Sequence, residues 1–190
     1  YGLSLLTVGG IYGIIVLGLN LQWGITGLFN IGIAGFFAVG AYSTAILTSP
    51  ATENHVGGFE LPVAIGLLGS MLFSGIMAYI IGKICLRLRG DYLAIATIGL
   101  AEILRLILKN EVWLTSGPRG IPGIPRPFEE LGQPWSEICF LIMVLIILFV
   151  IFMALQRAIN SPWGRVMKAI RENEKAAAST GKNVDGLRLE

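Results

Sequence analysis

The chain has 190 residues, of which 54% are hydrophobic and only 14% are charged, and its mean hydropathy is +0.74. Soluble domains have about 25% charged residues, so this composition excludes an ordinary soluble globular protein and predicts an integral membrane protein. The net charge of +2 is too small to indicate a nucleic-acid-binding protein. The two cysteines, Cys85 and Cys139, do not have the spacing of a metal or redox site.

The first two apolar stretches, residues 3–21 and 25–47, contain no charged residue, and each is long enough to cross the hydrocarbon core as a helix. The second is rich in glycine and contains Asn30. Such a composition predicts a helix inside the bundle that is broken near Asn30–Gly32 and lines a pathway. Tight packing by small residues is the alternative interpretation.

A polar loop, residues 48–60, precedes the third predicted span at 61–86, and a basic turn leads to the fourth span at 92–108. The fourth span carries Glu102 and Arg105, which are three residues apart and can meet on one helix face. Charges at this depth should not face lipid. Either the pair locks this helix against its neighbours or it borders a translocation route. The candidate substrate-pathway residues are Asn30, Gly32, Gly35, Thr97, Glu102 and Arg105.

A long outer loop, residues 109–134, follows the fourth span, and its glycines and prolines exclude regular helix and predict a shaped, packed loop. An uncharged fifth span covers residues 138–155. The predicted fold is therefore all-α, a polytopic membrane protein with five visible spans.

A charged segment, Ser161–Gly181, follows the last span. Its serine and the proline after it are typical of a helix start, and its glycine is typical of a helix end. The apolar side chains recur at the spacing of one helical face: Trp163, Val166, Met167 and Ile170. Glu174 falls on the same stripe, where a helix that only lies on lipid headgroups rarely has a carboxylate. This pattern favours a docking element for a cytosolic protein, with a surface amphipathic helix as the alternative.

Lysine and arginine predict the orientation. One side of the membrane would hold Lys83, Arg87, Arg89, Arg157, Arg165, Lys168, Arg171, Lys175, Lys182 and Arg188; the other would hold Lys109, Arg119 and Arg126. The side rich in positive charge is expected to be cytosolic. The predicted division is therefore a transmembrane region at 1–160 and a cytosolic helix with its following segment at 161–190.

Four stretches resemble the permease subunits of branched-chain amino-acid ABC importers: Leu19–Tyr42, Leu86–Leu108, Thr115–Ile121 and Ser161–Gly181. They occur in the family order and cover about half of the residues, and the RLRGDYLAI and GPRGI segments make the chain more similar to the M-type than to the H-type subunit. The resemblance implies an importer in the bacterial inner membrane, built from two permeases, two cytosolic ATPase subunits and an external substrate-binding protein. It also implies spans beyond the five visible here.

The resemblance further implies that the Ser161–Gly181 helix docks to the ATPase. The general importer motif has Glu-Ala-Ala, three residues, then Gly, whereas this chain has Lys175-Ala176-Ala177 and Gly181, with the acid displaced by one residue to Glu174. The predicted docking residues are Trp163, Met167, Ile170, Glu174, Ala176, Ala177 and Gly181.

The sequence contains no GxxxxGK[ST] phosphate-binding loop. We therefore expect no enzymatic activity, no metal and no cofactor in this chain, and ATP would be used by the partner subunit. Branched-chain amino acids are the expected substrates, and urea or another neutral amino acid is an alternative. An ion-coupled secondary transporter or channel is the alternative from another class, since it would explain Glu102 and Arg105 as a charge relay.

Overall fold

The computed structural model describes residues 1–28, 30–50, 58–85, 88, 91–129, 132–173, 179 and 186. Helices account for all the regular structure of these residues, and no strand occurs among them, as predicted for an all-α protein. The chain forms two compact units, one from Tyr1–Asn30 with Phe128–Glu190 and the other from Ile31–Pro127.

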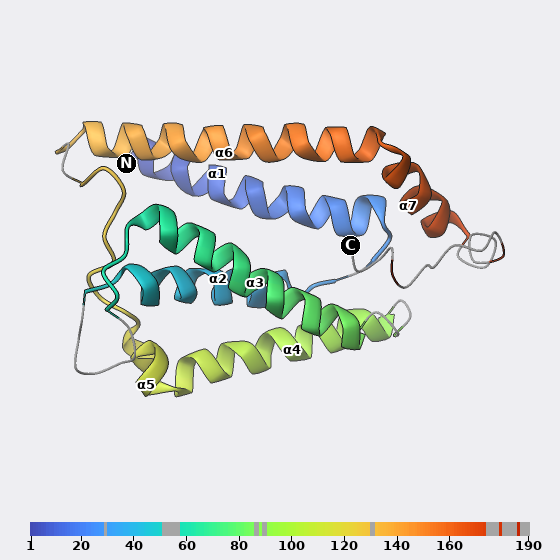
Figure 1. Cartoon of the computed structure of the whole chain (residues 1–190), viewed down its shortest axis with the longest axis horizontal. Coiled ribbons are helices and arrows are strands. Elements are labelled where there is room, and N and C mark those ends of the chain that lie inside the picture. Colours follow the sequence, from blue (N-terminus) through green and yellow to red (C-terminus); the bar gives the residue numbers. More distant parts are fainter. Residues whose placement is uncertain are drawn as a thin grey trace. The chain divides into compact units, whose positions relative to one another are not determined.

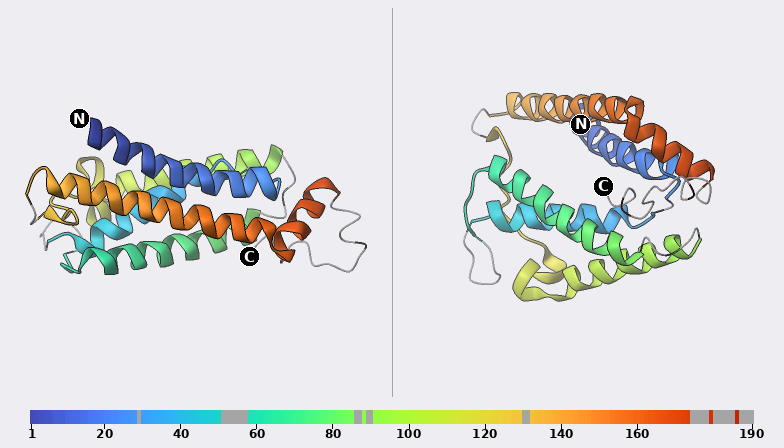
Figure 2. Two further views of the ribbon diagram at one scale, coloured as in Figure 1. Left: turned by 90° about the horizontal axis from the view of Figure 1, so that it is seen from above. Right: turned by 45° about the vertical axis from the view of Figure 1, so that its right-hand side comes forward.

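The first unit is built on two long helices, α1 (Gly2–Leu19) and α6 (Trp135–Asn160), which lie side by side (Figures 1 and 2). Their close approach depends on glycine: a Cβ added at Gly10 would lie 2.8 Å from Val144 Cγ1. Alpha-helix α1 continues into a π-helical segment, η1 (Asn20–Ile25). Alpha-helix α6 is followed by the short helix α7 (Pro162–Glu172).

The second unit contains α2 (Ile33–Thr48), α3 (Val63–Cys85) and α4 (Asp91–Asn110). Helices α2 and α3 pack through small residues, since a Cβ at Gly66 would lie 2.4 Å from Thr48 Cγ2. Helix α2 also packs on α4, where a Cβ at Gly35 would lie 3.0 Å from the Ala101 Cα. Close contact of this kind is typical of helix pairs in membranes.

Within the described part of the chain, three helical segments are long and apolar enough to cross a membrane: Gly2–Ile25, Val63–Cys85 and Trp135–Asn160. They correspond to the predicted first, third and fifth spans. The predicted second span is a helix only from Ile33 to Thr48, which is shorter than a typical spanning helix. The predicted fourth span, α4, is helical but carries Glu102, Arg105 and Lys109. The structure therefore supports three candidate spans, and the count of five stays a prediction.

The outer loop differs from its prediction in one respect. It begins with a single helical turn, α5 (Val112–Thr115), followed by a 3-10 turn, η2 (Gly117–Arg119), so its first part is regular. The fully buried Thr115 hydroxyl donates to the Leu108 carbonyl at 2.5 Å and accepts from the Gly117 N–H at 3.3 Å. This local hydrogen bonding stabilises a turn that the glycine and proline content alone did not indicate.

The two compact units do not follow the predicted division into 1–160 and 161–190, because α7 packs with η1 and α6 inside the first unit. The predicted division concerns which residues lie in the membrane and which in the cytosol, and it stays a prediction.

Candidate functional site

Helix α7 leaves the end of α6 at an angle, beside the end of α1 (Figures 1 and 2). Ser161 is its N-cap, and the Ser161 Oγ accepts a hydrogen bond from the Gly164 N–H at 3.4 Å. The same hydroxyl donates to the Ala158 carbonyl at 2.6 Å. Pro162 occupies the first helical position, where its missing N–H costs nothing. The predicted helix start at Ser161 and Pro162 is therefore present.

The apolar part of the predicted stripe is present on α7, but this chain itself covers it. The helix ends at Glu172, where Asn173 is extended, and not at Gly181 as predicted. Met167 and Ile170 are each only 1% exposed and form a buried cluster with Ile25 of η1. Partly buried side chains surround this cluster: Leu21, Ile159, Trp163 and Val166. We call these seven residues the joint cluster. Direct contact of Met167 or Ile170 with another protein would need this cluster to open.

The π-helical end of α1 gives the joint cluster its shape. The Thr26 N–H donates to the Leu21 carbonyl at 3.2 Å, and the Thr26 hydroxyl donates to the Gln22 carbonyl at 2.5 Å. The Gly24 Cα has no room for a side chain, because a Cβ there would lie 2.3 Å from Asn20 Oδ1. Single π-helical turns within α-helices are frequent at functional sites.

Arg171 connects α7 to this end of α1. Its guanidinium Nη1 donates a hydrogen bond to the Gly24 carbonyl, 147 residues away in the chain. Its aliphatic stem lies against Gly27, where φ is +71° and an added Cβ would be 2.8 Å from Arg171 Cγ. The last turn of η1 has no basic residue of its own. Arg171 thus supplies a positive charge where a helix C-terminus favours one.

Two predicted pathway residues, Asn30 and Gly32, lie before α2, where the described residues 26–28 and 30–32 are irregular. Buried Thr97 of α4 accepts a hydrogen bond from the Ile31 N–H at 3.2 Å and donates to the Ala94 carbonyl at 3.0 Å. Gly32 is the N-cap of α2, and Gly35 packs against Ala101 of α4. The structure therefore brings Thr97 and Gly35 into one packed α2–α4 contact; Asn30 belongs to the other unit.

Glu102 and Arg105 form the predicted ion pair. Arg105 Nη2 lies 2.6 Å from Glu102 Oε1, and Arg105 Nε lies 2.8 Å from Glu102 Oε2, so the contact is bidentate. The two side chains are 52% and 59% exposed, respectively. Both side chains are more than half exposed, so no other described residue covers them. The ion pair is therefore present, and its role, to lock this helix against its neighbours or to border the translocation route, stays a prediction.

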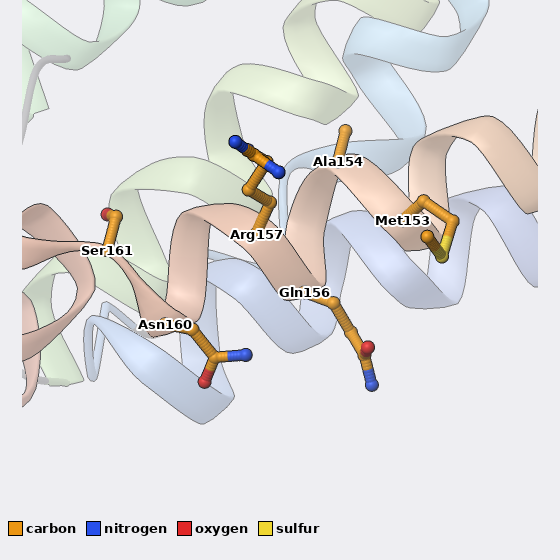
Figure 3. A pocket seen from close by; sticks show the side chains of 6 residues that line it. All are labelled: Met153, Ala154, Gln156, Arg157, Asn160 and Ser161. Atoms are coloured by element: carbon orange, nitrogen blue, oxygen red, sulfur yellow. The ribbon is translucent and has the colours of Figure 1, made fainter.

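An open hollow of about 650 Å³ lies along the end of α6, lined by Met153, Ala154, Gln156, Arg157, Asn160 and Ser161 (Figure 3). One helix and its C-cap provide all of these side chains, which point to different sides of α6 in Figure 3. A hollow with a single wall does not enclose a small solute, so we assign it no binding role. No cluster of metal-ligating side chains was found among the residues that the structure describes.

Four predicted docking residues lie outside the described part of the chain: Glu174, Ala176, Ala177 and Gly181. Sequence reasoning missed Arg171 and Ile25, because a contact between a side chain and a backbone carbonyl 147 residues away leaves no periodic pattern. The sequence could have indicated the close contact at Gly164. Glycine destabilises a helix, so a glycine in the first turn of a helix with a serine cap and a proline suggests that a side chain would not fit there.

The family model described as "Branched-chain amino acid transport system / permease component" matches residues 1–190. The high-affinity branched-chain amino acid transport system permease protein LivM of Salmonella typhimurium is 35% identical, over 96% of this chain and 47% of its own length. The protein of the same name from Escherichia coli is 34% identical over the same shares. A LivH permease protein of Salmonella typhimurium is 27% identical, over 94% of this chain and 60% of its own length.

The higher identity to LivM than to LivH agrees with the predicted M-type resemblance. The chain spans about half the length of the LivM relatives from these two bacteria. No solved structure is significantly similar to it. Because the family model covers all 190 residues, this chain belongs to the family of permease components of branched-chain amino acid transport systems.

Proposed function

We propose that this chain is part of the permease subunit of an ATP-driven importer of branched-chain or related neutral amino acids in a bacterial inner membrane. The permease would form the translocation path together with a second permease subunit. A cytosolic ATPase would supply the energy, and an external binding protein would deliver the substrate. Family membership over the whole chain is the observation that carries this proposal.

The exposed apolar surfaces of the long helices support a membrane location. In α1, α3 and α6 large hydrophobic side chains are exposed, among them Leu5, Leu68 and Phe149. Side chains of this kind are stable against lipid tails but costly in water. We include α2 and α4 as two further spans, because α2 has no charged residue and packs on both α3 and α4.

The outward face of α7 is the proposed docking surface for the ATPase. Its exposed residues Arg165, Lys168 and Ala169 lie on the side of α7 opposite the joint cluster. The apolar stripe has another task, since it attaches α7 to the end of α1. This proposal differs from the sequence-based hypothesis for Trp163, Met167 and Ile170; the predicted docking roles of Glu174, Ala176, Ala177 and Gly181 stay predictions.

The irregular backbone at Ile31 and Gly32 and the contact of Ile31 with α4 are the proposed border of the pathway. Non-helical backbone at membrane depth is tolerated where it is buried in protein or lines a water-filled cavity. Thr97 satisfies the Ile31 N–H there. Substrate selectivity would depend mainly on the external binding protein.

The exposed Glu102–Arg105 pair is the observation that favours an ion-coupled secondary transporter instead. Co-purification separates the two functions. We expect the tagged full-length permease to bring down an ATPase subunit with an ATP-binding loop, and its transport to require ATP. A permease that purifies without an ATPase and transports on an ion gradient alone would overturn the ABC assignment.

Charge reversal tests the docking surface. The double variant Arg165→Glu and Lys168→Glu should enter the membrane normally but lose ATPase co-purification. The matched control is Arg119→Glu in η2, an exposed arginine of the predicted outer loop, which should retain the ATPase. Equal recovery of the ATPase with both proteins would show that this face of α7 is not the docking surface.

A further inference from the structure

We propose that Arg171 is a positioning residue that fixes α7 to the C-terminal end of α1, so that these two helices move as one body during transport. This inference rests on the proposed function only for its consequence, since the attachment itself is a property of the first unit. It names a path by which a force on the outward face of α7 reaches a membrane-spanning helix.

The first argument is electrostatic. A helix C-terminus carries unpaired carbonyl groups and a partial negative charge of about half an elementary charge. In η1 the Leu21 and Gln22 carbonyls accept hydrogen bonds from Thr26, whereas Gly24 accepts one from Arg171. A hydrogen bond with a charged donor is roughly twice as strong as a neutral one. Arg171 therefore neutralises the end of α1 from another helix.

The second argument is geometric. The stem of Arg171 passes over Gly27, whose φ of +71° and close approach to Arg171 Cγ both favour glycine. The guanidinium then reaches the Gly24 carbonyl. The backbone at Gly24 and Gly27 thus accommodates a long side chain that ends in a planar hydrogen-bond donor. A lysine side chain could also pass over Gly27, but its compact ammonium group lacks the planar donor geometry of the guanidinium.

The third argument concerns what the joint cluster cannot do alone. Apolar contact is non-directional, and a cavity of about 50 Å³ lies beside the cluster, lined by residues of α1, η1 and α6 that include Leu21, Ile25 and Ile159. This space leaves room for the apolar side chains to rearrange. A directed hydrogen bond between Arg171 and Gly24 is the contact that fixes the orientation of α7 on η1.

The first test measures the attachment directly. Spin labels at Val16→Cys in α1 and Glu172→Cys in α7 are introduced into the assembled full-length transporter, with Cys85 and Cys139 replaced by alanine. Both label positions are exposed. We expect one narrow distance distribution that is the same without nucleotide and with trapped ATP. A distance that changes between the two states would overturn the proposal, whatever the transported substrate is.

The second test uses Arg171→Met, which keeps the apolar stem but removes the charged donor. We expect the label distance to broaden and the uptake per ATP hydrolysed to fall about tenfold, as the loss of a charged hydrogen bond predicts. Arg171→Lys should recover part of both. The control is Arg157→Met, at another exposed arginine of the same unit, in the last turn of α6, and it should leave both quantities unchanged.

An Arg171→Met transporter with the wild-type distance distribution and wild-type uptake per ATP would contradict the positioning role. If Arg171→Met fails to assemble, the proposal is still tested by the distance between the two spin labels in the transporter with Arg171, compared without nucleotide and with trapped ATP. If the wild-type complex shows no ATP-dependent uptake, the proposed function is wrong, while the distance measurement still tests the attachment of α7 to α1. The two hypotheses can therefore fail separately.

Discussion

The substitution Gly164→Ala should weaken the elbow between α6 and α7. A Cβ at this position would lie 2.2 Å from the Ile159 carbonyl oxygen and 2.7 Å from the Ala158 carbonyl oxygen. Ordinary contact begins near 3.4 Å, so the methyl group and the backbone would have to separate by about 1.2 Å. Because backbone atoms at a helix junction cannot rotate away, we expect an overpacking cost of ~3 kcal/mol, at the upper end of the usual range.

Alanine also stabilises a helix relative to glycine, by ~1 kcal/mol. The net loss should therefore be ~2 kcal/mol, which corresponds to a fall in the unfolding midpoint of about 4 °C or more. Thermal unfolding of the purified protein, followed by tryptophan fluorescence, measures it, and Trp163 of the joint cluster reports on the elbow itself.

The matched control is Gly99→Ala in α4, where an added Cβ meets no atom within 4 Å. This variant gains the helix propensity without a clash, so its unfolding midpoint should equal or exceed that of the wild type. Equal midpoints for Gly164→Ala and Gly99→Ala would refute the steric reasoning at the elbow.

Two further predictions concern polar groups in the second unit. Glu102→Gln and Arg105→Met should each reduce the folded yield, because each leaves one charge of the span without its partner, and the double variant should restore it. Normal uptake by the folded double variant would assign the pair a structural role. Ser49→Ala should leave the unfolding midpoint unchanged or raise it, because the Ser49 hydroxyl is fully buried and has no partner among the described residues; a marked fall would show a partner outside them.

The long uncharged runs of this sequence were sufficient to predict the main helices. Helices α2, α3 and α4 end within two residues of the predicted second, third and fourth spans. A charged or proline-containing segment follows each of these runs, and such residues are costly to bury in lipid. The predicted break in the second run is present as the irregular segment before Ile33. The helical turn at Val112–Thr115 was missed, because its stability depends on hydrogen bonds that Thr115 makes to the end of α4.

The candidate site shows where periodicity stops being informative. A stripe containing Met167 and Ile170 indicates that one face of α7 is covered, but the spacing is the same whether the cover is an ATPase or the end of α1. The structure shows that Ile25 and Leu21, at the end of α1, and Ile159 of α6 cover this face. Likewise, the three-residue spacing of Glu102 and Arg105 predicted their ion pair, whereas their exposure depends on which side of α4 meets α2, and local spacing does not specify that side.

ATP-dependent uptake is the most direct test of the central claim. The full-length permease, its partner permease and its ATPase are reconstituted in vesicles with the external binding protein, and entry of labelled leucine, isoleucine and valine is measured. We predict uptake that requires ATP hydrolysis and continues when ion gradients are collapsed. Uptake that persists without the ATPase and stops when the ion gradients are collapsed would contradict the account.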